Sequence, residues 1–198
     1  MSGKNDAEDI RSAVREKYRK AAESVSEVFA YPTGREGAEK LGYDSDLIAS
    51  APAALLDTFC GVGCPYSLAG ISRGERVLDI GCGGGFDLFC AARMVGPEGK
   101  VFGIDLSEEM IEKARKNLDL AGASNAHTQV GHSERLPFED DEFDVVISNG
   151  ALNLSPEKQR TYSEMWRVLR PGGRLQFADM VLKDDLPAEK MTAEAWSQ

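Results

Sequence analysis

The stretch VLDIGCGGG, residues 77–85, indicates the fold of the whole chain. An apolar run ends in a glycine-rich loop, and a helical pattern begins at Phe86. Because glycine adopts positive φ and has no side chain, such a loop lets a ligand approach the main chain. The free N–H groups at the start of the next helix favour a negatively charged group. The stretch therefore predicts a strand, a ligand-binding turn and a helix.

Downstream of this stretch, short apolar runs alternate with helical patterns. The predicted strands and helices are, in chain order, strands 76–81 and 100–105 with helices 86–95 and 108–121, then strands 126–131 and 143–149, helix 156–169 and strand 174–181. This alternation predicts an α/β fold, a doubly wound and mostly parallel sheet with helices on both faces. The Pro171-Gly172-Gly173 segment is expected to be a structural turn before the last strand.

That last strand would lie at an edge of the sheet, where it is prone to wrong pairing unless something covers it. We therefore expect the fold to be truncated after its fifth strand, or a partner chain to cover the strand. The alternative is a sheet that naturally has five strands.

Upstream of residue 71, the pattern differs. Residues 1–9 are expected to form a disordered tail, and residues 10–70 an N-terminal region of helices with a cysteine-containing turn. Residues 10–30 have apolar side chains at helical spacing, which is typical of either a surface helix or a lid over a small-molecule site. A second helix is predicted over residues 46–57. The turn FCGVGCP, residues 59–65, follows it with Cys60 and Cys64.

Composition narrows the class of protein. A chain of 198 residues fits one globular domain with a real core. The formal net charge of −10 argues against nonspecific nucleic-acid binding. No apolar run approaches the roughly 20 residues that span a bilayer, and the polar N-terminus has no signal-peptide core. We expect a cytoplasmic protein whose four cysteines remain thiols.

Two acids indicate what the glycine loop binds. A dinucleotide loop would have a third glycine where Phe86 stands. Asp79, two residues before Gly81, suits a ligand with a cationic part. Asp105 ends the next strand, where a carboxylate can accept hydrogen bonds from vicinal ribose hydroxyls. Asp105 could instead cap the helix that follows, and the two roles can coexist.

Four ordered motifs resemble the class I S-adenosylmethionine-dependent methyltransferases over residues 70–182. They are VLDIGCGGG, GIDLSEEMIEKAR, GHSERLPFEDDEFDVVISN and EMWRVLRPGGRL. The resemblance implies a Rossmann-like methyltransferase fold, with S-adenosyl-L-methionine as cofactor and residues 71–198 as the domain that binds it.

The resemblance also assigns roles to residues. Asp79, Gly81 and Gly83 would hold the methionine part, and Cys82 belongs to the same loop, with its own side chain expected as a small buried filler. Asp105 would hold the ribose, and Leu106 and Met110 would flank the adenine. His132 and Ser133 would meet the adenine edge, although the family often has an acid where His132 stands. Asn149 would face the methyl group and the substrate.

A closer resemblance, over residues 42–182, is to the arsenite methyltransferases. It rests on GYDSDLIASAP, on the cysteine turn and on ISNGALNLSPEKQRTYSEMWRVLRPGGRLQFADMV. It implies that thiolates hold trivalent arsenic, with Cys64 as a matched ligand and Cys60 as an extra candidate, so that the arsenic lone pair attacks the methyl carbon. Gly150 stands where the family has a second thiol. Another family thiol follows a segment like AEAWSQ, after which this chain stops at Gln198.

Three functions therefore compete: an arsenite-type methyltransferase, a methyltransferase for a small organic metabolite such as a quinone, and a cofactor-binding module without catalysis. In the second case, Asn149, Tyr66 and the N-terminal helix would form the substrate pocket. No structural Zn²⁺ is expected, since a second pair of ligands is missing. The methyl acceptor would be a metalloid or a small molecule. We expect no membrane partner, and association, if any, through the exposed sheet edge.

Overall fold

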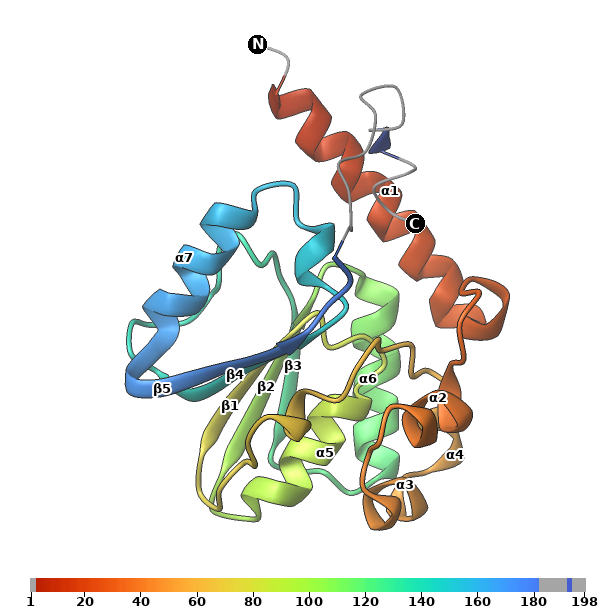
Figure 1. Ribbon diagram of the computed structural model, residues 1–198, viewed down its shortest axis with the longest axis vertical. Helices are drawn as coiled ribbons and strands as arrows, with labels where there is room; N and C mark the ends of the chain where they lie inside the picture. The colour runs from red at the N-terminus through yellow and green to blue at the C-terminus, as the bar shows by residue number, and fades with distance from the viewer. Residues whose placement is uncertain (1–2, 182–191, 194–198) are drawn as a thin grey trace.

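The computed structural model describes residues 3–181 together with residues 192 and 193, and it contains one five-stranded parallel sheet (Figure 1). The strands lie in the order β3-β2-β1-β4-β5. Their bounds are β1 Arg76–Ile80, β2 Lys100–Asp105, β3 Ala126–Val130, β4 Phe143–Asn149 and β5 Leu169–Ala178. The predicted fold class is confirmed. Strand order reverses between β1 and β4, and in sheets of this kind ligands bind at the carboxyl ends of such strands.

Helices cover both faces of the sheet. Helices α5 (Phe86–Val95) and α6 (Glu108–Leu120) lie on one face, and α7 (Lys158–Val168) lies on the other (Figure 1). Because successive side chains of a strand point to opposite faces of the sheet, each face has its own core cluster. Val77 of β1 packs in the cluster under α5, and its neighbour Leu78 packs in the cluster that contains Met165 of α7. Among the described helices, none is long and apolar enough to cross a bilayer.

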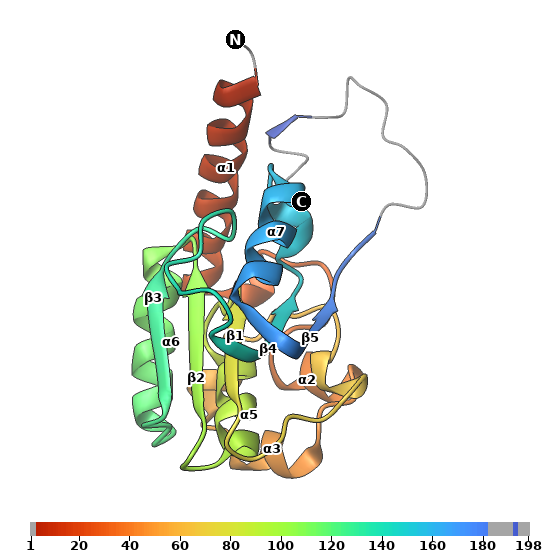
Figure 2. The ribbon, with the colours of Figure 1, turned by 90° about the vertical axis from the view of Figure 1, so that its left-hand side faces the viewer.

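The N-terminal region adds short helices to the α5 side of the sheet and one long helix above it. The long helix is α1, Gly3–Glu23, which extends beyond the carboxyl ends of the strands (Figure 2). The others are η1 Val25–Glu27, α2 Gly34–Lys40, α3 Ser45–Ser50, α4 Ala53–Leu56 and η2 Pro65–Ser67, with η3 Leu152–Leu154 later in the chain.

The first helix differs from the sequence prediction at both ends. The expected disordered tail, residues 1–9, is wrong from Gly3 onward, because α1 already begins there. Glu8 forms ion pairs with Arg11 and Arg15 on the following turns, which stabilises the start of the helix. The helix ends at Glu23 and not near residue 30.

The predicted second helix, residues 46–57, is two short helices. Ala51, which precedes Pro52, has φ −78° and ψ 133° and ends α3 in an extended conformation. A residue before proline disfavours the helical region, because the proline ring crowds its backbone. The sequence reading also missed α2.

The Pro171-Gly172-Gly173 segment is a bulge within β5 and not a turn before it. Leu169 pairs with Phe143 and Arg174 pairs with Val145, so β5 carries extra residues between the two pairs. Gly172 takes φ 82°, which favours glycine. As expected, β5 lies at the edge of the described sheet.

Candidate functional site

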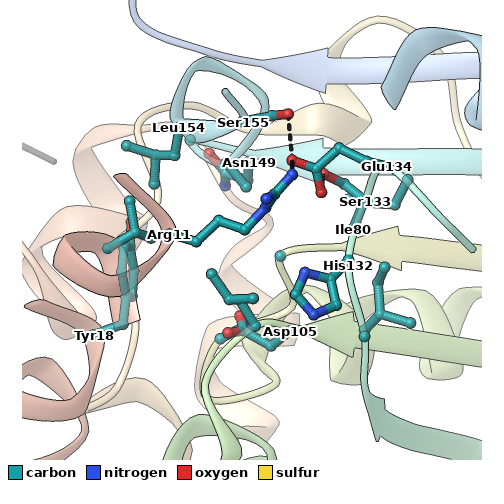
Figure 3. Close-up of a pocket in the computed structure, with 18 of the residues that line it drawn as sticks. Arg11, Tyr18, Ile80, Asp105, His132, Ser133, Glu134, Asn149, Leu154 and Ser155 are labelled. Carbon is teal, nitrogen blue, oxygen red and sulfur yellow. Dashed lines mark hydrogen bonds and ion pairs between the residues drawn. The ribbon is translucent and has the colours of Figure 1, made fainter. Parts of the chain in front are cut away.

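A pocket lies where the carboxyl ends of β1, β2 and β4 meet α1 (Figure 3). Its empty space is about 770 Å³, its open mouth included, which is within the range of small-molecule sites. Eight of the predicted site residues line it: Cys60, Gly81, Gly83, Asp105, Leu106, His132, Ser133 and Asn149. Asp79, Cys82, Met110 and Cys64 are not among the lining residues.

The glycine loop is held by the end of β2. The main-chain N–H groups of Gly81 and Cys82 both donate to the Ile104 carbonyl, at 2.9 and 3.0 Å. The Gly83 N–H donates to Oδ2 of Asp105, at 2.9 Å. Gly81 and Gly83 have φ of 77° and 49°, a region that other residues rarely adopt. The loop therefore needs its glycines for backbone conformation.

The glycines of this loop differ in how much space surrounds them. A Cβ at Gly81 would lie 2.3 Å from the Cβ of Ala151, and one at Gly84 would lie 2.1 Å from Oγ1 of Thr58. At Gly83, by contrast, the described residues place no atom within 4 Å of an added Cβ. Two glycines thus allow close packing within the protein, and Gly83 is the position where a ligand can reach the main chain.

Asp105 connects this loop to the start of α6. The residue as a whole is 8% exposed, and its Oδ1 accepts from the Ser107 N–H at 2.9 Å. Burial raises the Asp105 pKa, and main-chain hydrogen bonds from Ser107, Gly83 and Leu106 oppose that rise. Ser107 itself caps α6, because its hydroxyl accepts from the Met110 N–H. A carboxylate oxygen has two acceptor sites, so capacity remains for a ligand in the pocket.

Asp79 lies beneath the pocket and not in it. Its side chain is 1% exposed, and neither carboxylate oxygen has a hydrogen-bond partner among the described residues. Burial, followed by the nearby charges of Asp87 and Asp105, raises the Asp79 pKa well above its ordinary value. Asp79 is therefore not among the lining residues, but its two unpartnered oxygens leave its contact with the methionine part of the cofactor a prediction.

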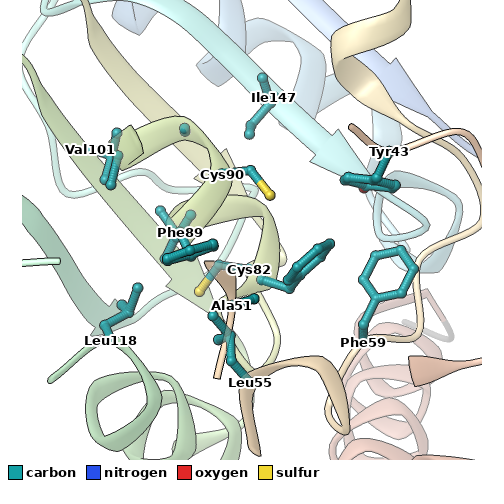
Figure 4. Close-up of a cluster of buried hydrophobic side chains, with 14 of the residues drawn as sticks. Tyr43, Ala51, Leu55, Phe59, Cys82, Phe89, Cys90, Val101, Leu118 and Ile147 are labelled. Carbon is teal, nitrogen blue, oxygen red and sulfur yellow. The ribbon is translucent and has the colours of Figure 1, made fainter. Parts of the chain in front are cut away.

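Cys82 and Met110 belong to the packing of the fold. Cys82 is buried in the core cluster under α5 (Figure 4), and an added Cβ at Gly103 would lie 2.8 Å from its Sγ. Met110 is fully buried against Ala22 and Val25 of the N-terminal region. Cys82 is thus the buried filler expected of its own side chain, and Met110 joins α6 to the N-terminal helices.

One of the two cysteines of the turn lies in the pocket lining. It is Cys60, and the Tyr31 hydroxyl donates to the Cys60 carbonyl at 2.9 Å. Burial, with a smaller effect from the Asp105 charge, raises the pKa of Cys60 to about 12. Cys64 packs against the core cluster, and burial raises its pKa too. At the end of β4, Gly150 lines the pocket without a side chain.

Several residues that line the pocket were not predicted from the sequence. Arg11, Val14 and Tyr18 of α1 line the pocket, as the lid interpretation expects (Figure 3). Arg11 reaches Glu134 at 3.3 Å and also pairs with Glu157. The sequence feature that could have identified Arg11 is its position as a charged residue beside the apolar stripe of the first helix. The partner, Glu134, is 6% exposed and accepts from the Ser155 hydroxyl at 3.0 Å.

Comparison with known proteins agrees with this geometry. A family model described as a methyltransferase domain matches residues 71–197. An arsenite methyltransferase from Halobacterium salinarum is 41% identical, over 94% of this chain and 51% of its own length. A demethylmenaquinone methyltransferase from Listeria welshimeri is 34% identical, over 64% of this chain and 53% of its own.

A solved structure extends the likeness to three dimensions. It is an arsenic (III) S-adenosylmethionine methyltransferase from Chlamydomonas reinhardtii, 34% identical, with a TM-score of 0.61 over 81% of this chain and 53% of that one. The chain thus spans about half the length of these relatives. Given the matched model, the sheet order and the glycine-loop pocket, the chain belongs to the methyltransferase domain family and is similar to arsenite methyltransferases.

Proposed function

We propose that the chain is an S-adenosylmethionine-dependent methyltransferase with its cofactor site in the pocket of Figure 3. The observation that supports this most is the 2.9 Å hydrogen bond from the Gly83 N–H to Asp105. It joins the glycine loop to a carboxylate at the end of β2, and both residues line the pocket. A carboxylate in that position can accept from both hydroxyls of a ribose.

The other lining residues divide among the parts of the cofactor. Asp105 would hold the ribose, the main chain at Gly81 and Gly83 would approach the methionine part, and Leu106 would flank the adenine. His132 and Ser133 would meet the adenine edge. When bound, the cofactor supplies a methyl group carried on a sulfonium. The chain's own residues have to align the acceptor and exclude water, and alignment alone contributes about 7–11 kcal/mol in well-oriented reactions.

For the acceptor we propose trivalent arsenic held by the cysteine turn. Cys60 lines the pocket, and Cys64 follows it in the same turn. Thiolate sulfur is a soft ligand that suits a soft centre. Because burial raises the Cys60 pKa to about 12, this thiol would carry its proton at neutral pH. As the sulfur–arsenic bond forms, one arsenic–oxygen bond of arsenite would break, and the thiol proton would leave with that hydroxide as water. The arsenic lone pair would then attack the methyl carbon as the carbon–sulfonium bond breaks.

A second candidate is a small organic acceptor. It is favoured by the glycine at position 150, which offers no thiol, and by Cys64 lying outside the pocket lining. The Listeria relative, by its name a demethylmenaquinone methyltransferase, supports the same alternative. A module that binds the cofactor without catalysis would be the third outcome of the experiment.

Calorimetry and a methylation assay separate these outcomes. We expect S-adenosylmethionine to bind, and arsenite to bind in its presence. The Cys60→Ser and Cys64→Ser variants should keep cofactor affinity and lose arsenite binding, and Cys90→Ala, which removes a buried core thiol, serves as the control. Cofactor binding with no arsenite effect points to the second candidate, tested by methyl transfer from labelled cofactor into a metabolite extract. Absence of cofactor binding would overturn the proposal.

Location and association follow from the same features. The unpaired thiols suit the reducing cytoplasm. The edge strand β5 carries half-exposed Phe177 close to Tyr162 of α7, with ring centroids 6.4 Å apart. We propose that a second copy of the chain can associate there. Nucleic acid is not a proposed partner, because the net charge is −10.

A further inference from the structure

The amide side chain of Asn149, at the end of β4, bonds to the cysteine turn. Its Oδ1 accepts from two successive main-chain N–H groups, those of Val62 at 2.8 Å and Gly63 at 3.2 Å. Its Nδ2 donates to the Gly63 carbonyl at 2.8 Å. These two residues lie between Cys60 and Cys64, so one amide holds the middle of the turn from a strand 86 positions away.

The same amide also reaches the first turn of α5. Nδ2 of Asn149 lies 3.1 Å from Oδ2 of Asp87 and 3.0 Å from the Tyr43 hydroxyl. That hydroxyl donates to Oδ1 of Asp87 at 2.6 Å, and the Tyr66 hydroxyl donates to the Asp87 carbonyl at 2.5 Å. The cysteine turn, β4 and the helix that follows the glycine loop are therefore joined in one hydrogen-bonded network.

This network uses the full hydrogen-bonding capacity of the amide. An asparagine side chain has two N–H donors and an oxygen with two lone pairs. Oδ1 already accepts two hydrogen bonds, and three acceptors surround Nδ2. The packing is equally close, since a Cβ at Gly61 would lie 2.3 Å from Nδ2 of Asn149. A methyl acceptor in the pocket would find no unused donor or acceptor on this side chain.

We propose that Asn149 is a positioning residue for the cysteine turn and makes no polar contact with the methyl acceptor. It fixes the main chain at Val62 and Gly63, and so fixes where the Cys60 thiol meets the pocket. Only the role of the Cys60 thiol in this inference rests on the proposed function. The positioning itself is testable without any methyl transfer.

Amide hydrogen exchange of the unaltered protein is the first test. The N–H groups of Val62 and Gly63 should exchange at least tenfold more slowly than freely solvated amides, because Oδ1 of Asn149 accepts from both. Exchange at the freely solvated rate overturns the proposal. This measurement requires neither cofactor nor a variant, so it stands even where a variant fails to fold.

Variants of Asn149 then test whether its side chain causes the protection of these N–H groups from exchange. Asn149→Ala should raise exchange at Val62 and Gly63 about tenfold and speed iodoacetamide labelling of Cys60 by a similar factor. Asn149→Asp keeps an acceptor for both N–H groups and should restore part of the protection.

The control is Asn125→Ala. Asn125 also bonds to main-chain carbonyls, including that of Gly96 at 3.0 Å, but it does so at the opposite end of α5. It should leave the cysteine turn unchanged. A loss of cofactor affinity in Asn149→Ala with the turn still protected would make Asn149 a ligand contact and overturn the inference. Failure of the proposed function would appear separately, as absence of S-adenosylmethionine binding to the unaltered protein.

Discussion

Asp105 is the residue that joins the ligand-binding loop to the helix after it. Its two oxygens accept from Gly83 and Ser107, so the carboxylate is fixed in orientation before any ligand arrives. A preorganised acceptor of this kind costs little ordering when it binds. Its replacement should therefore weaken binding by the full value of the lost hydrogen bonds.

We expect Asp105→Ala to reduce S-adenosylmethionine affinity by about 1–3 kcal/mol, measured by calorimetry. The loss should be in enthalpy, because hydrogen bonds to the ribose are removed. Asp119→Ala, which changes an exposed acid on α6, is the matched control and should leave affinity unchanged. Equal affinities for the two variants would contradict the assignment of Asp105.

Asp79 gives a second prediction, for stability against pH. Its pKa in the folded chain is raised by burial and by Asp87 and Asp105, so the folded state binds a proton more tightly than the unfolded state does. The resulting stabilisation is present at low pH and is lost as pH rises above the ordinary aspartate value. Asp79→Asn should remove this loss, so that the variant gains stability relative to the unaltered protein as pH rises above about 4. Urea unfolding at several pH values measures it, and parallel curves for the two proteins would refute the idea.

Helix α1 is the N-terminal element that contributes Arg11, Val14 and Tyr18 to the pocket lining. Arg11, with 16% of its side chain exposed, pairs with Glu134, which is 7% exposed by the same measure. A second pair on the same helix, Arg15 with Glu8, has 45% and 60% exposure. Removing the arginine from a buried ion pair costs more stability than removing it from an exposed pair, because only the buried carboxylate is then left without water.

The comparison of these two ion pairs yields a prediction about helix α1. Arg11→Ala should loosen α1 by about 1–3 kcal/mol, raise its amide exchange and speed cofactor release. Arg15→Ala should change α1 by less than about 1 kcal/mol. Stopped-flow release of S-adenosylmethionine and exchange of α1 peptides provide the measurements. Similar effects of both variants would mean that the Arg11 pair does not hold the helix.

At the scale of the whole molecule, α7 and β5 both carry exposed apolar side chains. Trp166 is 81% exposed and Phe177 is 39% exposed, and β5 is the edge strand of the described sheet. An edge strand offers unpaired N–H and C=O groups to another chain. We expect concentration-dependent self-association in sedimentation velocity. Phe177→Lys should weaken it about tenfold, whereas Leu120→Lys, at an exposed position on α6, should not. A monomer at all concentrations would contradict the prediction.

Much of the fold follows from the sequence, because the strands and helices from residue 76 onward alternate with clear periods. The pocket follows less completely. Asp79 lies next to the glycine loop in the sequence, but the alternation of β1 directs its side chain to the α5 face, with Val77. The bonds of Asn149 to Val62 depend on a turn whose conformation no periodic pattern encodes. The position of Asn149 at a strand end was predictable, whereas its partners in an irregular turn were not.

The contacts at the glycines limit which substitutions could redirect this chain to other substrates. A Cβ at Gly61, Gly81 or Gly84 would lie within 2.3 Å of a neighbouring side chain, so a substitution there requires that neighbour to move. Val14 and Leu154 line the same pocket and already carry side chains, so a substitution there adds no Cβ. Directed evolution toward a different methyl acceptor should therefore vary these two positions first and keep the glycines unchanged.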